Sequence, residues 1–253
     1  MRFSDSVFQT VILAAGNGSR LVGRQGVPKP LMTVGGVALV AHALHHARAS
    51  GCSEAVVVVG HEKDRVKTAV QALETGLRVR FVESPDPTAP NGVSLLAAES
   101  LAAPRFFLQM VDHLFDDVAL PKLVASPLAP DEAGRVLIDW SPGEIDLQDA
   151  TKVRVEGDRV QAIGKGLDPW DAVDAGCFVL THAVFTALRQ APKTEPRTVS
   201  SGMRQLASNR MLGAAAVNGT AWIDVDTPAD RAFAETLLQQ RLLRTGEGAA
   251  QRA

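Results

Sequence analysis

The chain has 253 residues, of which 46% are hydrophobic, and a formal net charge of −2 at pH 7. This length allows one large α/β domain or two small ones. The balanced charge excludes a general affinity for nucleic acid, so any anionic ligand must be bound by local cations. No charged-then-apolar leader opens the chain and no segment approaches the ~20 apolar residues of a membrane span. We therefore expect a cytoplasmic protein without a membrane span.

The first half of the chain alternates β-branched, hydrophobic segments with segments of helical periodicity. Strands are predicted at residues 7–15, 55–60, 77–83 and 105–111, and helices at 37–50, 62–74 and 92–101. This alternation predicts parallel strands joined by right-handed helical crossovers. Ligands of such sheets bind beyond the carboxyl ends of the strands. The glycine turn after the first strand and Asp112 after the fourth both lie there.

The second half of the chain is richer in strands. They are predicted at residues 135–140, 151–156, 159–163 and 172–180, with a hairpin turn at Gly157 and Asp158. A last helix is predicted at 228–243, with Thr227 as its N-cap and Pro228 at its first position. We expect residues 1–245 to form one domain and residues 246–253 to form a disordered C-terminal tail.

The glycine turn belongs to residues 11–31, which read VILAAGNGSRLVGRQGVPKPL. Backbone N–H groups of the turn, followed by the cations Arg20 and Lys29, suit a nucleoside triphosphate. A dinucleotide-binding fingerprint is excluded because Leu21 stands at its third glycine position, and a Walker loop is excluded because Pro30 follows Lys29. The segment predicts an enzyme that handles triphosphates.

This opening motif, L-A-A-G-x-G-S-R-L and then P-K-P-L, resembles the signature of nucleotidyltransferases with a GT-A-like fold. Further segments follow in family order: NGVSLL (91–96), MVDHLF (110–115), ATKVRV (150–155), IGK (163–165), VDAGCF (173–178) and WIDVDT (222–227). Together they resemble the CTP:inositol-1-phosphate cytidylyltransferases, over residues 8–235. The resemblance implies an α/β, single-domain Rossmann-like (GT-A-like) fold with a mixed, mostly parallel sheet flanked by helices.

The reaction implied by this resemblance is transfer of CMP from CTP to inositol 1-phosphate, with Mg²⁺ as cofactor. The implied catalytic residues are Arg20, Lys29 and Lys165, the first two on the leaving pyrophosphate and the third on the acceptor phosphate. Asp112 follows a hydrophobic strand, where it either binds the metal or caps a turn. Asp224 and Asp226 would share one face of a strand. Family position favours Asp224 as metal ligand, while Asp226 either supports it or helps to start the last helix.

Substrate-binding residues are implied by the same segments. The nucleotide-binding set is Leu13, Ala14, Ala15, Gly16, Gly18, Ser19, Glu83, Asn91, Gly92 and Ser94. The acceptor-binding set is Lys152, Asp174 and Gly176. Glu83 could accept a hydrogen bond from the cytosine amino group. Lys152 and Arg154 point to the same sheet face, so one of them is expected to face the cleft.

Alternatives remain open on the sequence alone. The acceptor could be a sugar 1-phosphate, phosphocholine or an aminoalkylphosphonate, with CTP or UTP as donor, and a catalytically dead relative is the alternative from another class. Relatives of this kind are best known as fusions to a membrane-embedded phosphatidyltransferase, which would here be a separate chain. His113 either lines the site or has no role in it, and Trp222 is expected to pack in the core. The helical spacing of His42, His45 and His46 fits an exposed helix face.

Overall fold

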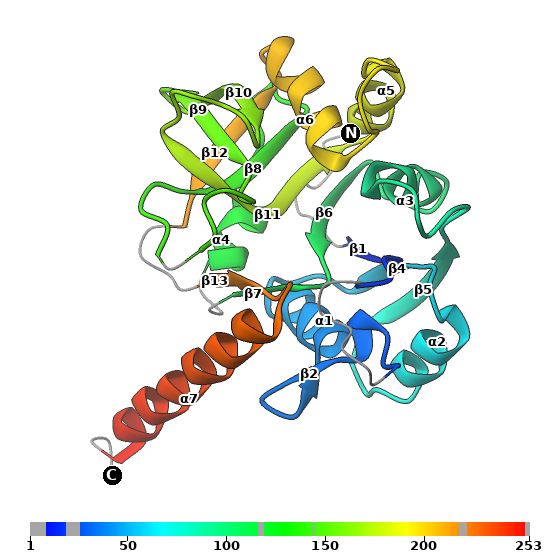
Figure 1. Ribbon diagram of the computed structural model, residues 1–253, viewed down its shortest axis with the longest axis vertical. Helices are drawn as coiled ribbons and strands as arrows, with labels where there is room; N and C mark the ends of the chain where they lie inside the picture. The colour runs from blue at the N-terminus through cyan, green and yellow to red at the C-terminus, as the bar shows by residue number, and fades with distance from the viewer. Residues whose placement is uncertain (1–8, 19–25, 116–118, 144, 218–221, 251–253) are drawn as a thin grey trace, which may run out of the picture.

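A nine-stranded mixed β-sheet forms the centre of the molecule (Figure 1). The computed structural model describes residues 9–18, 26–115, 119–143, 145–217 and 222–250, with side chains up to residue 239. The strand order is β5-β4-β1-β6-β11-β8-β12-β10-β9. The bounds are β1 Gln9–Ala14, β4 Glu54–Val59, β5 Arg78–Glu83, β6 Arg105–Met110, β8 Gly134–Asp139, β9 Lys152–Glu156, β10 Arg159–Gly164, β11 Ala172–Thr181 and β12 Leu212–Ala216.

The first half of the chain supplies the parallel side of this sheet, as predicted. Strand β1 pairs in parallel with both β4 and β6, and β4 pairs in parallel with β5. The connections are the helices α1 (Leu39–Ala49), α2 (Lys63–Gln71) and α3 (Asn91–Ala97). The carboxyl ends of β1 and β6 therefore lie side by side, which brings the glycine turn next to Asp112.

The second half supplies the antiparallel side. Strand β11 pairs antiparallel with β6 and β8, and β10 pairs antiparallel with β9 through the predicted hairpin turn. Gly157 in that turn has a φ of +63°, a conformation that favours glycine. Strand β12, which was not predicted, adds parallel to β8.

Several short elements were also missed. They are β2 (Thr33–Val34), β3 (Val37–Ala38), β7 (His113–Phe115), β13 (Trp222–Asp224), α4 (Ala119–Ala125), α5 (Ala183–Gln190) and α6 (Val199–Ser208). The pair β13–β7 is antiparallel and sets Asp224 opposite His113. Residues 37 and 38, predicted as helical, belong instead to a two-stranded hairpin with β2 that precedes α1.

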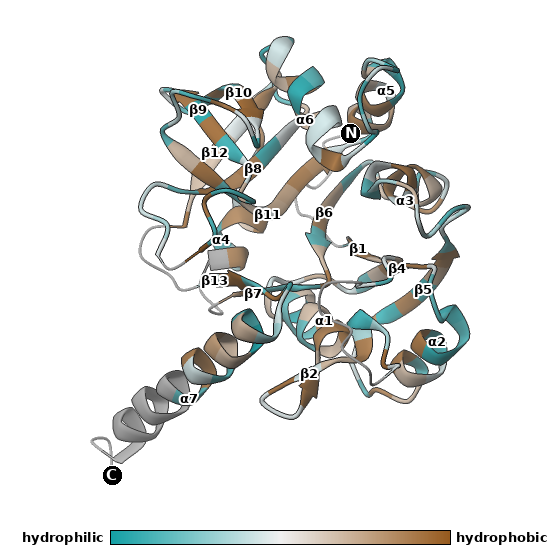
Figure 2. Ribbon diagram, in the orientation of Figure 1, coloured by the Kyte–Doolittle hydropathy of each residue, from teal (hydrophilic) through white to brown (hydrophobic). Residues whose placement is uncertain are grey.

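Hydrophobic side chains cover both faces of the parallel strands. In β1, Val11 and Leu13 pack toward α3, α5 and α6, whereas Ile12 and Ala14 pack toward α1 on the other face. Burial on both faces explains why these strands read as continuous hydrophobic runs. Brown segments in Figure 2 accordingly gather on the strands of the sheet, and teal segments lie mostly on loops and outer helix turns.

Helix α7 (Pro228–Ala250) starts at the predicted cap. The Thr227 Oγ1 atom accepts a hydrogen bond from the Asp230 N–H, and the Asp230 carboxylate accepts one from the Thr227 N–H, which is a reciprocal capping arrangement. The helix continues past Leu243, where its end was predicted. Residues 246–250 of the expected tail are thus helical, and residues 251–253 lie outside the described residues. No described helix is long and apolar enough to span a membrane.

Candidate active site

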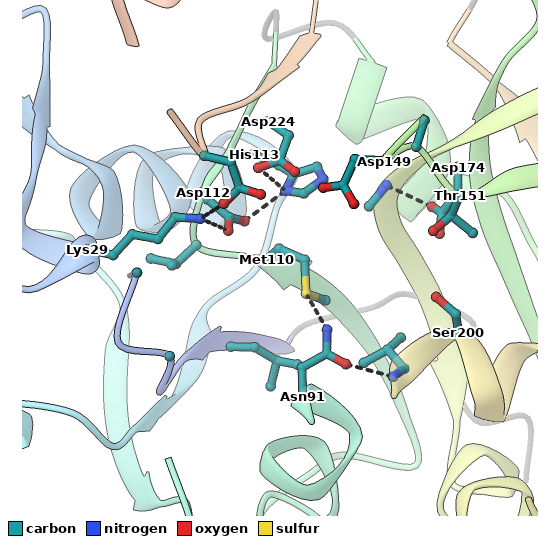
Figure 3. Close-up of a pocket in the computed structure, with 18 of the residues that line it drawn as sticks. Lys29, Asn91, Met110, Asp112, His113, Asp149, Thr151, Asp174, Ser200 and Asp224 are labelled. Atoms are coloured by element: carbon teal, nitrogen blue, oxygen red, sulfur yellow. Dashed lines mark hydrogen bonds and ion pairs between the residues drawn. The ribbon is translucent and has the colours of Figure 1, made fainter. Parts of the chain in front are cut away.

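A cavity of about 720 Å³ lies beyond the carboxyl ends of β1 and β6 and reaches toward β10 and β11 (Figure 3). The predicted site residues that line it are Leu13, Ala15, Gly16, Gly18, Lys29, Asn91, Ser94, Asp112, Lys165, Asp174, Gly176, Asp224 and Asp226. One cavity therefore brings together side chains from the first strand to the start of the last helix. Ser19 and Arg20 lie outside the described residues.

The glycine turn after β1 holds Lys29 in place. Gly18 has a φ of +61°, and a Cβ atom there would lie only 2.5 Å from the Cβ of Lys29. Lys29 opens a short 3₁₀ helix, η1 (Lys29–Leu31), and stands between Pro28 and Pro30. Only 9% of its side chain is exposed. The two prolines thus restrain the lysine backbone, and Gly18 leaves room for the first carbons of the lysine side chain at the edge of the cavity.

The Lys29 ammonium lies among carboxylates. Its Nζ atom is 2.5 Å from the Oδ2 atom of Asp112 and also pairs with the Oδ1 atom of Asp226. The Nδ1 atom of His113 lies 2.8 Å from the other Asp112 oxygen, Oδ1. Burial alone would favour a protonated Asp112, but the charges of Lys29 and His113 hold the pKa of this carboxyl well below its usual range. Both Asp112 oxygens therefore have partners.

Asp224 completes this group from the neighbouring strand β13. Its Oδ1 atom is 3.9 Å from the Nδ1 atom of His113, and it is buried without a hydrogen-bond partner among the described residues. Burial raises the pKa of Asp224 above its usual range; the charge of His113 opposes this shift, and the negative charge of Asp112 adds to it. One potential ligand atom each from Asp112, His113 and Asp224 lie within 4.8 Å of one another. A buried carboxylate oxygen without a partner, beside a second carboxylate, fits a hard divalent cation such as Mg²⁺.

His113 is held rigidly between its neighbours. Its ring is nearly parallel to that of Trp222, with an interplanar angle of 8° and centroids 6.1 Å apart. At its edge, a Cβ atom on Gly176 would lie 2.3 Å from the imidazole, and Gly176 has a φ of +76°. Burial lowers the pKa of His113, but the carboxylates of Asp224 and Asp112 outweigh burial and raise it to about 9. The site therefore favours the protonated imidazole, whose Nδ1 atom is hydrogen-bonded to Asp112 and lies 3.9 Å from the Oδ1 atom of Asp224.

The other end of the cavity contains the predicted acceptor residues. Lys165 follows β10 and forms an ion pair with Asp149 from the loop before β9. The Oδ1 atom of Asp174 accepts a hydrogen bond of 2.7 Å from the Gly176 N–H. Burial raises the pKa of Asp174 to about 6, although the Gly176 N–H opposes that shift. This end thus offers one lysine together with carboxylates.

Asn91 and Ser94 line the cavity from α3, but their polar groups have partners. The Asn91 side-chain oxygen accepts the Val199 N–H at 2.8 Å, and the Ser94 hydroxyl is 3.0 Å from that of Ser84. Gly92 does not line the cavity. A Cβ atom there would lie 2.5 Å from the Arg197 carbonyl oxygen. Gly92 therefore permits close packing of α3 against the segment before α6, and its expected contact with the nucleotide stays a prediction.

Three other predicted residues also lie away from the cavity lining. Ala14 faces the core beneath α1. Glu83 ends β5 and pairs with Lys63 and Lys67 of α2, each at 2.7 Å. Its charge is thus paired at the outer edge of the sheet, and Glu83 is not among the residues that line the cavity. Lys152 is buried and its Nζ atom donates to the Lys165 carbonyl oxygen at 2.9 Å, so it supports the backbone of Lys165.

Comparison with known proteins places the chain in a family. Residues 10–206 match the family described as MobA-like NTP transferase domain. The chain belongs to this family. A solved structure of the inositol-1-phosphate CTP transferase from T. maritima superimposes with a TM-score of 0.81 at 27% identity, covering 90% of this chain and 93% of that one. The predicted α/β nucleotidyltransferase fold is thereby confirmed.

Curated relatives align with most of this chain. The chain is 38% identical over 230 residues to the bifunctional IPC transferase and DIPP synthase of Rubrobacter xylanophilus, covering 90% of this chain and 51% of that protein. It is 31% identical to the CMP-5'-(3-aminopropyl)phosphonate synthase of Streptomyces rubellomurinus, covering 95% of this chain and 41% of that protein. The chain spans about half the length of the curated relatives it matches.

Several residues that line the cavity were not predicted from the sequence. They are Asn17, the loop residues Pro87, Thr88 and Ala89, Met110, Ile145, Asp146, Asp149, Ser200, Trp222 and Asp230. Trp222, expected in the core, is half-buried at the cavity wall, and its Nε1 atom donates to the Oδ2 atom of Asp139 at 2.8 Å. The only sequence feature that could have placed Trp222 at the cavity was its position two residues before Asp224. The loop residues come together only through the order of the strands.

Proposed function

We propose that the chain transfers CMP from CTP to inositol 1-phosphate, giving CDP-inositol and pyrophosphate. In this reaction an oxygen of the acceptor phosphate attacks the α-phosphorus of CTP, and the bond to the pyrophosphate oxygen breaks. The observation that carries the proposal is the single cavity that joins the group Lys29–Asp112–Asp224 to Lys165. The names of the similar proteins support the choice of CTP and of an inositol phosphate.

Charge in the cavity supports a divalent metal ion as part of the mechanism. Among the described residues, the lining has seven aspartates and only two lysines. A triphosphate without a counter-ion would be repelled by this lining, because like charges at short range disfavour binding. Mg²⁺ bound by Asp112 and Asp224 would neutralise triphosphate oxygens and the charge that develops on the leaving pyrophosphate.

The side chains of the protein mainly position the two anions. Lys29, beside the glycine turn, is suited to bind the triphosphate together with the N–H groups of Gly16 and Gly18. Lys165 at the far end is suited to bind the acceptor phosphate. No general base is required, since the attacking phosphate oxygen is already anionic. Rate enhancement then comes from holding the attacking oxygen in line with the leaving group.

An aminoalkylphosphonate is the second candidate acceptor, favoured by the 31% identity to the Streptomyces synthase. Carboxylates at the acceptor end, such as Asp149 and Asp174, could accept hydrogen bonds from inositol hydroxyls or from an ammonium group. Both acceptors present a phosphoryl oxygen to the same donor. The two candidates therefore differ only in the part of the acceptor that lies beyond Lys165.

Pyrophosphate release tests the proposal directly. The chain would be incubated with each of the four NTPs and Mg²⁺, against inositol 1-phosphate, glucose 1-phosphate, phosphocholine and 3-aminopropylphosphonate. Release with CTP and inositol 1-phosphate above every other pair supports the proposal. Release with UTP and a hexose phosphate refutes it, and preference for the phosphonate selects the second candidate. EDTA should abolish the release, and added Mg²⁺ should restore it.

Two substitutions assign roles within the cavity. Asp112→Asn is expected to lower Mg²⁺-dependent turnover by about 100-fold or more with the fold intact. Asp64→Asn, which changes an exposed carboxylate on α2, is the matched control and should turn over normally. Lys165→Ala should raise the KM for the acceptor more than the KM for CTP. Normal turnover by Asp112→Asn would remove this residue from the metal site, and a larger effect of Lys165→Ala on CTP would reassign the lysine.

A further inference from the structure

Lys29 stands where a divalent metal would approach Asp112. Its ammonium is 2.5 Å from the Oδ2 atom of Asp112 and also pairs with Asp226. The remaining Asp112 oxygen is 2.8 Å from the Nδ1 atom of His113. A metal ion that binds Asp112 must therefore displace one of two resident partners or share an oxygen with it. Two cations on one carboxylate repel each other, and the repulsion is strong because the site is largely buried.

The two partners differ in how easily they can leave. The His113 ring is confined by the stacked Trp222 and by Gly176, at whose position even a Cβ atom would overlap the ring. Lys29 has a backbone fixed by its neighbouring prolines, but its ammonium stands at the end of a flexible four-carbon stem. The ammonium can therefore swing away while the main chain stays in place. A triphosphate on the adjacent glycine turn would offer it a new anionic partner.

We propose that Lys29 is the resident counter-cation of Asp112 and Asp226, so that the carboxylates bind a divalent metal tightly only when a nucleoside triphosphate draws the Lys29 ammonium away. This inference rests on the proposed function, because it takes the triphosphate and the metal from that reaction. It adds a binding order: metal and nucleotide enter together, and the metal alone binds weakly. Lys29 thus has one role before the substrate binds and another afterwards.

Metal binding without nucleotide tests this inference. Binding of Mn²⁺ to the nucleotide-free full chain would be measured by electron paramagnetic resonance. Lys29→Met removes the competing ammonium, so its Mn²⁺ affinity should exceed that of the wild type by about tenfold or more. A tenfold change needs only part of the repulsion that two close charges exert on each other near a protein surface. Lys29→Arg keeps the charge and should bind Mn²⁺ as weakly as the wild type. In the wild type, added CTP should increase the Mn²⁺ affinity of the protein.

Controls separate this effect from a general change of charge. Lys63→Met removes an exposed lysine paired with Glu83 at 2.7 Å, away from the cavity, and should leave Mn²⁺ binding unchanged. Adding Asp112→Asn to Lys29→Met should abolish the gain. If Lys29→Met does not fold, Lys29→Gln replaces it with the same expected gain.

The outcomes also separate this inference from the proposed function. Unchanged or weaker Mn²⁺ binding by the neutral Lys29 variants would overturn the inference, even if the wild type makes CDP-inositol. Tighter binding by those variants would support it, even if pyrophosphate release with CTP and inositol 1-phosphate failed. In that case only the substrates of the reaction would need to be reassigned.

Discussion

Replacing Gly176 by alanine should disturb the metal centre through His113. Gly176 has a φ of +76°, and an added Cβ atom would lie 2.3 Å from the imidazole. The backbone conformation alone costs an alanine about 1–2 kcal/mol. The methyl group would also force the ring away from Asp112, and loss of a hydrogen bond to a charged group costs about 1.5–3 kcal/mol. The free energy of unfolding should therefore fall by about 2.5–5 kcal/mol.

Gly157 provides a matched control for this prediction. It has a similar φ of +63°, but its added Cβ atom would meet nothing within 4 Å. Gly157→Ala should thus show only the backbone cost of about 1–2 kcal/mol. Both variants would be unfolded in urea, with the free energies obtained by linear extrapolation. A Gly176→Ala variant no less stable than Gly157→Ala would refute the role assigned to the imidazole contact.

A double variant tests the same contact independently. If the methyl group of Gly176→Ala acts by striking His113, then adding His113→Ala should cost less in the variant than in the wild type. Such non-additivity is the signature of residues in direct contact. Strictly additive losses of stability would show that the two positions act separately. Mn²⁺ affinity should also change in Gly176→Ala and stay unchanged in Gly157→Ala, because only the former displaces the His113 ring from Asp112.

Three further predictions concern residues around the cavity. Glu83→Gln should change the KM for CTP by less than about twofold, since Glu83 pairs with Lys63 and Lys67 outside the cavity lining; loss of cytosine selectivity would contradict its placement. Burial raises the pKa of Asp174 to about 6. Between pH ~4 and ~6 the folded state therefore binds more protons than the unfolded state, and the free energy of unfolding falls as the pH rises through that range. Asp174→Asn should thus be more stable than the wild type at pH 7, by up to about 3 kcal/mol, with little advantage at pH 4; urea unfolding at both pH values checks this, and an equal advantage at both would refute it. Burial raises the pKa of the Cys52 thiol to about 12, so maleimide at pH 7.5 should label it only after unfolding, and rapid labelling of the native chain, read by mass spectrometry, would contradict this burial.

The parallel half of the sheet could be predicted because its strands are long and buried on both faces. Strands such as β1 and β4 each have six residues, enough for a hydrophobic run to be recognised. Strands β7 and β13 have only three residues each, and three residues carry no periodicity. These two strands nevertheless set Asp224 opposite His113. The motif therefore identified the carboxylates, but the pairing that makes them one site could not be predicted.

Strand order explains why Glu83 lies outside the cavity lining. The sequence correctly placed this residue at the carboxyl end of a parallel strand, where ligands of α/β sheets bind. Strand β5, however, is an outermost strand of the sheet, and β4 separates it from β1 and β6. Hydrophobic patterns report that a segment is a strand and not which neighbours it has. An edge position leaves Glu83 beside α2, whose lysines then pair with it.

The two lysines that the sequence identified as phosphate ligands both have carboxylate partners in the structure. Lys29 pairs with Asp112 and Asp226, and Lys165 pairs with Asp149. A phosphate that binds Lys29 must compete with the carboxylates of Asp112 and Asp226, which disfavours binding of a bare anion. The Lys165–Asp149 pair is exposed and opposes a phosphate less strongly. A triphosphate that arrives with a divalent metal brings a replacement cation for Asp112. The acidic lining thus favours binding of metal-bound nucleotide over free phosphate. This discrimination depends on charge alone and needs no contact with the base or with a hydroxyl group.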